Sequence, residues 1–143
     1  DPQASEGTGE TDQPDEPETG IVVAGIGECE CQGPDKREVH GFVLEDISGS
    51  LSPNAWGSAA VNASRRHQAD RIIGEQNNGG AMVEATVRTV DRGASYKPVH
   101  ASRGKRTRAE PIAALYEQAK IHHVGPPAVP VVADTPAPAV PTL

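Results

Sequence analysis

The residues best placed for chemistry lie in residues 70–80, DRIIGEQNNGG. The apolar part predicts a short buried strand over residues 71–74 that ends at the carboxylate of Glu75. A Gly-Gly turn then precedes a helix that we expect to begin near Ala81. Because ligands in α/β sheets collect beyond the carboxyl ends of strands, Glu75 is a candidate catalytic or metal-binding acid. The local pattern leaves a solvated turn residue open as the alternative.

A metal centre at Glu75 would need further carboxylates. Two divalent ions about 3.5–4 Å apart can activate a water and stabilise the leaving oxygen of a phosphodiester. Mg²⁺ and Mn²⁺ prefer oxygen ligands, and residues 1–20 carry seven acids and no base. The pattern does not choose among the candidates, and an acid of this kind is by itself more often a solvated residue than a metal ligand. The candidates are Asp1, Asp12, Asp15, Glu16 and Asp46.

A basic segment lies in the second half of the chain. Of the 20 acids, seven lie in residues 1–20, which leaves 13 to balance the 13 Lys and Arg residues. Residues 92–108 carry six of those bases and no acid, and their last part precedes or opens a predicted helix. Backbone N–H groups at a helix N-terminus also attract phosphate, so we expect a surface that contacts a nucleic-acid backbone without reading bases. A solvated charged loop stays open as the alternative. The candidate DNA-binding residues are Arg103, Lys105, Arg106 and Arg108.

The cysteines and histidines show no metal-ligand spacing. Cys29 and Cys31 are separated by one residue, which gives neither a disulfide framework nor the four-ligand pattern of structural zinc. We interpret them as an incidental loop pair in a reducing, cytoplasmic protein. The five histidines are scattered, and we expect none of them at the functional site.

The remaining patterns predict a small α/β domain with a mixed sheet. The elements expected, in order, are strands over 20–26 and 38–46 that form an antiparallel hairpin, a helix opened by Ser52 and Pro53, the strand over 71–74, a helix over 81–90, a strand over 96–101, a helix opened by a capping box at Thr107, and a strand over 121–124. We expect the 20–26 strand to be buried on both faces. Residues 1–19 predict an acidic loop, and residues 126–143, with six prolines, predict a disordered tail. The chain has no stretch of apolar residues long enough for a membrane helix.

Several longer strings carry a family resemblance. They are Asp1-Pro2, TGIVVAG (19–25), DISGSLSP (46–53) with Trp56, ADRIIGEQNNGGAMV (69–83), ASRGKRTRAEP (101–111), and ALYEQ (114–118) through to Gly125. In this order they resemble the C-terminal nuclease domain of the terminase large subunit of tailed phages and gene-transfer agents. The resemblance covers residues 1–125.

The resemblance implies an RNase H-like mixed sheet flanked by helices. It also implies endonucleolytic cleavage of concatemeric double-stranded DNA by a two-metal site of Mg²⁺ or Mn²⁺ during genome packaging. Asp1 and Glu75 correspond to catalytic metal ligands of the family, and the loop of Arg103 and Lys105 corresponds to a segment that faces DNA. The implied partners are double-stranded DNA, a portal protein and the terminase small subunit, with no membrane. The implied location is the bacterial host cytoplasm, at the procapsid.

Two departures from the family lead us to expect a fragment. The family's first, central strand precedes the position of Asp1, and no late aspartate motif of the family follows Gly125. We therefore expect a partial nuclease domain over 1–125 and a tail over 126–143 that arises from a frameshift or a truncated gene. Two alternatives stay open: another RNase H-like nuclease of the resolvase or transposase type, and a non-catalytic DNA-binding or packaging-partner module.

Overall fold

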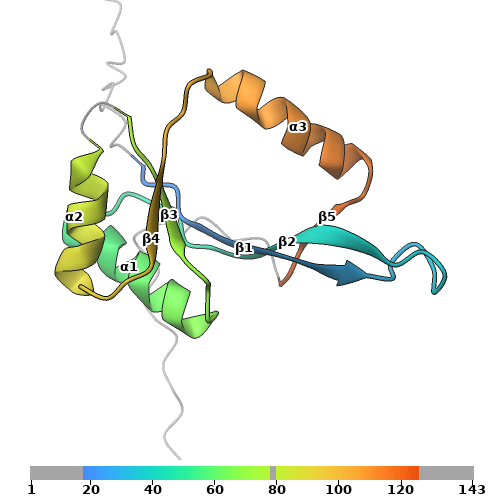
Figure 1. The fold of residues 1–143 in the computed structure, drawn as a ribbon, viewed down its shortest axis with the longest axis horizontal. Coiled ribbons are helices and arrows are strands. Elements are labelled where there is room, and N and C mark those ends of the chain that lie inside the picture. Colours follow the sequence, from blue (N-terminus) through green and yellow to red (C-terminus); the bar gives the residue numbers. More distant parts are fainter. Residues whose placement is uncertain (1–17, 78–79, 126–143) are drawn as a thin grey trace, which may run out of the picture.

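The computed structural model describes residues 18–77 and 80–125 (Figure 1). Its elements in chain order are β1 (Val22–Cys29), β2 (Glu38–Asp46), α1 (Pro53–Arg66), β3 (Ile72–Glu75), α2 (Ala81–Val90), β4 (Tyr96–Val99), α3 (Lys105–Glu117) and β5 (Ile121–His123). The predicted α/β class and the predicted order of elements are confirmed. No helix in the described ranges is long and apolar enough to cross a membrane.

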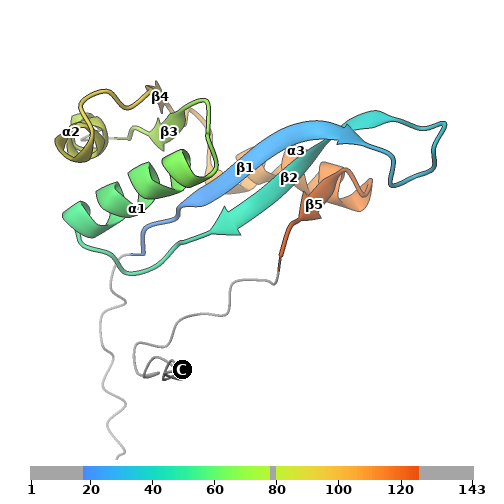
Figure 2. The ribbon, with the colours of Figure 1, turned by 90° about the horizontal axis from the view of Figure 1, so that it is seen from below.

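The strands form two separate sheets. In the first, β2 lies between β1, to which it is antiparallel, and β5, to which it is parallel. In the second, β3 and β4 are parallel. Figures 1 and 2 show α1 and α2 beside the β3–β4 sheet, whereas α3 lies apart from them near β5. The first sheet is mixed, as the sequence predicts.

The core of the described residues lies where α1 and α2 meet. Val61 of α1 and Val87 of α2 are each only 1% exposed, and Ala63 is as deeply buried. The helices approach closely because α1 has Gly57 at the contact, where a Cβ would lie 2.9 Å from Thr86 Cγ2 and 3.3 Å from the Thr86 carbonyl oxygen. Ser52 caps α1 as predicted, since its hydroxyl accepts a hydrogen bond from the Ala55 N–H at 3.4 Å.

The expected burial of the first strand is wrong. The strand extends to Cys29, past the predicted end at residue 26, and the side chains of Val22 and Ile26 are exposed. The reason is that β1 is an edge strand within the part of the chain that the structure describes, because only β2 pairs with it. An apolar run therefore does not distinguish an edge strand from a central one.

The last helix also differs from its prediction. It begins at Lys105 with Gly104 as the N-cap, so Thr107 lies inside the helix and the predicted capping box does not form. None of its side chains is buried. At its other end the chain turns directly into β5: Ala119 has a left-handed φ of 55°, and the Lys120 N–H donates to the Leu115 carbonyl at 2.9 Å. The position of α3 therefore depends on contacts at the two ends of the helix more than on side-chain packing along it.

The close contact at Gly57 gives a test of the helix packing. We expect Gly57→Val to destabilise the fold by about 1–3 kcal/mol, because the new side chain must displace Thr86. Denaturant unfolding of the full chain, followed by circular dichroism, measures the change. Asn62→Val, at an exposed position of the same helix, is the matched control. Equal unfolding midpoints for the two variants would contradict the packing.

Candidate nuclease site

Glu75 is the last residue of β3, at the end of the strand where the sequence predicts a functional acid. It lies opposite Val99 in the parallel pairing with β4, and the next N–H, of Gln76, donates to the Val99 carbonyl at 2.8 Å. The predicted buried strand is only partly buried, because Ile73 is 61% exposed whereas Gly74 is buried. The hydrogen bonds between β3 and β4 nevertheless fix the backbone around Glu75 on one side.

Gly74 and Tyr96 hold the end of β3 in place. The Tyr96 ring lies over Gly74 so closely that a Cβ at Gly74 would come within 2.0 Å of Tyr96 Oη. Burial raises the pKa of the Tyr96 hydroxyl. Only a glycine fits beneath the ring, and the ring in turn covers the backbone that leads into Glu75.

The Glu75 carboxylate is bound by Arg108 of α3. Arg108 Nη1 donates to Oε2 at 3.1 Å and Nη2 donates to Oε1 at 3.3 Å, while Asn77 Nδ2 donates to Oε1 at 2.9 Å. The Arg108 guanidinium, helped by Asn77 and by the charge of Lys105, holds the pKa of the Glu75 carboxyl below its usual range. The site therefore presents an ionised carboxylate at neutral pH.

One of the four predicted basic residues, Arg108, contacts Glu75, and the other three lie within five residues of Arg108 in the sequence. Lys105, Arg106 and Arg108 lie in the first turn of α3, and Arg103 lies in the loop before it. Arg108 also ties this loop to the helix, because its Nε donates to the Arg103 carbonyl at 3.0 Å. The structure thus brings Glu75 together with a basic surface from a segment about 30 residues later in the chain.

A cleft of about 590 Å³ adjoins the site. Residues from β1, α1, β3, α2 and β4 line it, and Glu75 is one of them. The lining is largely apolar, with Val87 and Tyr96 among its side chains. Glu75 therefore lies where an open, mainly apolar cleft meets a basic helix end.

The comparisons with known proteins identify the family. The terminase RNaseH-like domain model matches residues 5–134, which is most of the chain. The chain belongs to this family. No curated protein and no solved structure gives a significant match. The resemblance to the terminase nuclease domain is confirmed, and the mixed sheet with three helices is consistent with an RNase H-like fold.

The family match begins after Asp1 and ends beyond residue 125, the predicted end of the terminase domain. The match continues past residue 125 and reaches Asp134, inside the segment that the sequence analysis assigns to a tail. Asp1, the second predicted catalytic ligand, lies outside both the match and the described residues. The division of the chain at residue 125 and the role of Asp1 therefore stay predictions.

Of the other carboxylate candidates, the structure of the terminase domain describes only Asp46. Asp46, at the end of β2, accepts a hydrogen bond from the Ser48 N–H at 3.0 Å, and its contacts with Ser48 lower the pKa of Asp46. It fixes a turn. Asp12, Asp15 and Glu16 lie outside the described residues.

Within residues 18–77 and 80–125, the only group of at least three side chains that could hold one metal ion contains no carboxylate. It consists of Cys29, Cys31, His40 and His122. Sequence spacing does not predict this group, because the cysteines are one residue apart and the histidines are scattered along the chain. The signal that could have found it is a Cys-x-Cys pair in a hairpin whose second strand carries a histidine, but His122 lies 91 residues after Cys31.

The ion pair at Glu75 gives a pH-dependent prediction. The folded-state pKa of Glu75 lies below its ordinary 4.5, so the stabilisation from the pair is complete above that value and is lost as the pH falls through the lowered pKa. In Arg108→Gln we expect the pKa of Glu75 to rise toward its ordinary value, as measured by NMR titration of its carboxyl carbon. Arg106→Gln is the control, and an equal shift in both variants would contradict a specific role of Arg108.

Proposed function

We propose that this terminase domain cleaves double-stranded DNA endonucleolytically with Mg²⁺ or Mn²⁺, and that it acts on concatemeric DNA during genome packaging. The observation that carries the proposal is the position of Glu75, an ionised strand-end carboxylate in contact with the basic first turn of α3. Membership of the terminase RNaseH-like domain family supports the same activity.

The described residues fit the metal ions only in part. Glu75 offers the hard oxygen ligand that Mg²⁺ and Mn²⁺ prefer, whereas the Cys/His group offers softer donors. We propose Asp1 as the second ligand on the basis of the family resemblance. When bound, the ions would supply an activated water and stabilise the leaving oxygen of the phosphodiester.

Arg108 would prepare Glu75 and receive the DNA backbone. The side chains of Arg108 and Glu75 are 36% and 38% exposed, so solvent screens their attraction and the pair is easily exchanged. A guanidinium binds phosphate with the same two-pronged geometry that it uses for a carboxylate. We propose that an arriving phosphate takes over the Arg108 donors and so frees the Glu75 oxygens.

The neighbouring bases would orient the DNA. Lys105 and Arg106 lie in the same helical turn as Arg108, and Arg103 lies just before it. Contacts from such side chains to phosphates fix the register of a duplex without reading its sequence. By the family resemblance, the further partners would be a portal protein and the terminase small subunit, at the procapsid in the cytoplasm of a bacterial host.

A second candidate function is a non-catalytic DNA-binding or packaging-partner module. It is favoured by the pairing of Glu75 with Arg108, since no described carboxylate joins Glu75 in a group able to hold an ion. The family match favours a terminase domain over a resolvase or transposase.

Plasmid cleavage separates the two functions. We expect the purified chain to nick supercoiled plasmid in Mn²⁺ and Glu75→Gln to show no nicking above background, because the variant lacks the proposed carboxylate ligand. Glu110→Gln, at an exposed position of α3, is the matched control and should cut like the unaltered chain. The reaction should stop when the divalent ion is left out and resume when Mg²⁺ or Mn²⁺ is added.

The opposite outcome has a distinct signature. A folded chain that binds DNA equally well in EDTA and after Glu75→Gln, yet never cuts, would establish the binding module and overturn the nuclease. Gel-shift measurements beside circular dichroism supply both readouts.

The basic surface gives a separate prediction. We expect Lys105→Gln to weaken DNA binding and to reduce the slope of log affinity against log salt by about 1, because one phosphate contact is lost. The measurement is fluorescence anisotropy of a duplex in EDTA at several salt concentrations. Lys36→Gln, in the β1–β2 loop, is the control for loss of a charge alone. Identical salt slopes for the two variants would argue against a DNA contact at Lys105.

A further inference from the structure

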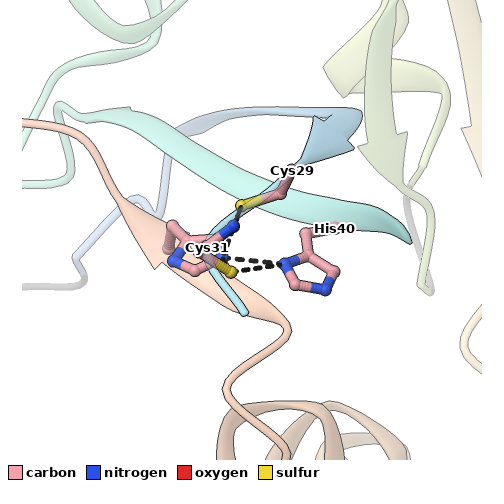
Figure 3. A group of neighbouring side chains, drawn as sticks. Cys29, Cys31 and His40 are labelled. Atoms are coloured by element: carbon pink, nitrogen blue, oxygen red, sulfur yellow. Dashed lines mark hydrogen bonds between the residues drawn. The ribbon is translucent and has the colours of Figure 1, made fainter. Parts of the chain in front are cut away.

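Four side chains that are far apart in sequence converge at one end of the β1–β2–β5 sheet (Figure 3). Cys29 ends β1, Cys31 lies in the following loop, His40 lies in β2 and His122 lies in β5. One donor atom from each lies within 4.8 Å of all the others. In Figure 3 the labelled side chains, Cys29, Cys31 and His40, point toward a common centre.

Three sulfur–nitrogen separations in this group match those around a single tetrahedral ion. Cys31 Sγ lies 3.5 Å from His40 Nδ1 and 3.6 Å from His122 Nε2, and Cys29 Sγ lies 3.7 Å from His122 Nε2. Zn–S bonds of about 2.3 Å and Zn–N bonds of about 2.0–2.1 Å at tetrahedral angles place sulfur and nitrogen about 3.6 Å apart. The two ring nitrogens, 2.9 Å apart, would separate slightly on binding.

The strand register explains the convergence of the ligands. His122 pairs with Phe42, and His40 lies two residues before Phe42, on the same face of β2. Cys29 pairs with Glu38, which is two residues before His40 and also on that face. The histidine rings accordingly stack with centroids 5.1 Å apart.

The β1–β2 loop returns Cys31 to the same place. Arg37 closes this loop by donating from Nε to Glu30 at 2.9 Å and from Nη1 to Glu28 at 3.3 Å. The Cys31 N–H donates to Cys29 Sγ at 3.3 Å, a bond that would stabilise a thiolate ligand. The loop backbone therefore orients the Cys29 sulfur, and the Arg37 contacts hold the loop that carries Cys31.

A carboxylate lies behind the buried histidine. His40 is 2% exposed, and its Nε2, the nitrogen that faces away from the group, has no hydrogen-bond partner among the described residues. The nearest acid is Glu38, whose Oε2 lies 3.7 Å from that nitrogen and 3.3 Å from Lys120 Nζ. Histidine ligands of metals usually direct their second ring N–H at a carboxylate. Glu38 is placed for this role, although 3.7 Å is longer than a hydrogen bond.

We propose that Cys29, Cys31, His40 and His122 bind one structural Zn²⁺ ion that fixes β5 to the β1–β2 hairpin. Two sulfur and two imidazole donors suit zinc far better than Mg²⁺. A two-iron cluster divides its ligands between two metal atoms, whereas these donors surround one point. Because protein side chains fill all four positions, the ion has a structural role and is separate from the chemistry at Glu75.

The ion would act where the fold is least supported. β5 has three residues, and α3, which leads into it, has no buried side chain. When one ion coordinates both His122 and the hairpin cysteines, it fixes the end of α3. Through the helix it also fixes the position of Arg108 beside Glu75. Zinc binding thus supports the proposed nuclease site without taking part in it.

Metal titration of the reduced full chain tests the site. We expect one Zn²⁺ per chain by elemental analysis, and Co²⁺ in its place should give the intense visible bands and thiolate charge-transfer band of a tetrahedral site with sulfur ligands. Cys31→Ser and His122→Asn should each lower the zinc affinity more than about 100-fold, beyond the 10–100-fold typical for loss of a supporting partner such as Glu38. His123→Asn is the matched control, because that ring contacts Tyr116 Oη at 2.6 Å instead.

Hydrogen exchange on the unaltered chain adds a readout that needs no variant to fold. Chelation should speed amide exchange in β5 and leave the α1–α2 contact unchanged. The proposal is overturned by a chain that takes up no equimolar zinc, by a Co²⁺ spectrum of an octahedral site without thiolate, or by unchanged affinity in both ligand variants. None of these outcomes depends on whether the domain cuts DNA.

Discussion

The parallel pairing of β5 with β2 is the interaction on which the arrangement of the proposed site depends. It is possible because β2 has Gly41 at the contact, where a Cβ would lie 2.8 Å from Ile121 Cδ1. Two backbone hydrogen bonds of 2.9 Å flank it, from the Gly41 N–H to the Lys120 carbonyl and from the Val124 N–H to the Val43 carbonyl. Since α3 buries no side chain, these bonds do more than helix packing to fix where Arg108 lies.

The domain keeps its hard and soft donors apart. Glu75 ends a strand of the β3–β4 sheet and is balanced by Arg108, whereas the cysteines and histidines lie on the other sheet. A divalent ion that prefers oxygen gains little from sulfur and imidazole, and zinc prefers the latter. The proposed Mg²⁺ or Mn²⁺ site and the proposed zinc site therefore lie on different sheets and differ in donor chemistry, so the two ions would not compete for one site.

Local signals in the sequence were enough for much of the fold. Ser52 followed by Pro53 marks a helix start by capping chemistry, and the end of a short apolar strand places Glu75 correctly. The burial of β1 is not predictable from its own residues, because its edge position depends on which strands pair with it. The start of α3 differs for a local reason, since Gly104 precedes the helix and Thr107 lies inside it. The Cys/His group was beyond local reasoning, because it exists only through the register of β2 with β5. The second carboxylate, Asp1, stays a prediction of the family resemblance.

The direct turn from α3 into β5 makes the helix behave as a lever with its pivot at the strand. Only three residues connect the last turn of the helix to Ile121, and one of them, Ala119, has a left-handed backbone. The connection is therefore too short to let the helix move independently of the strand. A helix of this length extends about 20 Å, so a tilt of about 3° at the strand would move its first turn by about 1 Å. Hydrogen bonds from Arg108 to Glu75 tolerate little more than that. Angular precision at a three-residue strand thus becomes positional precision at the far end of the helix.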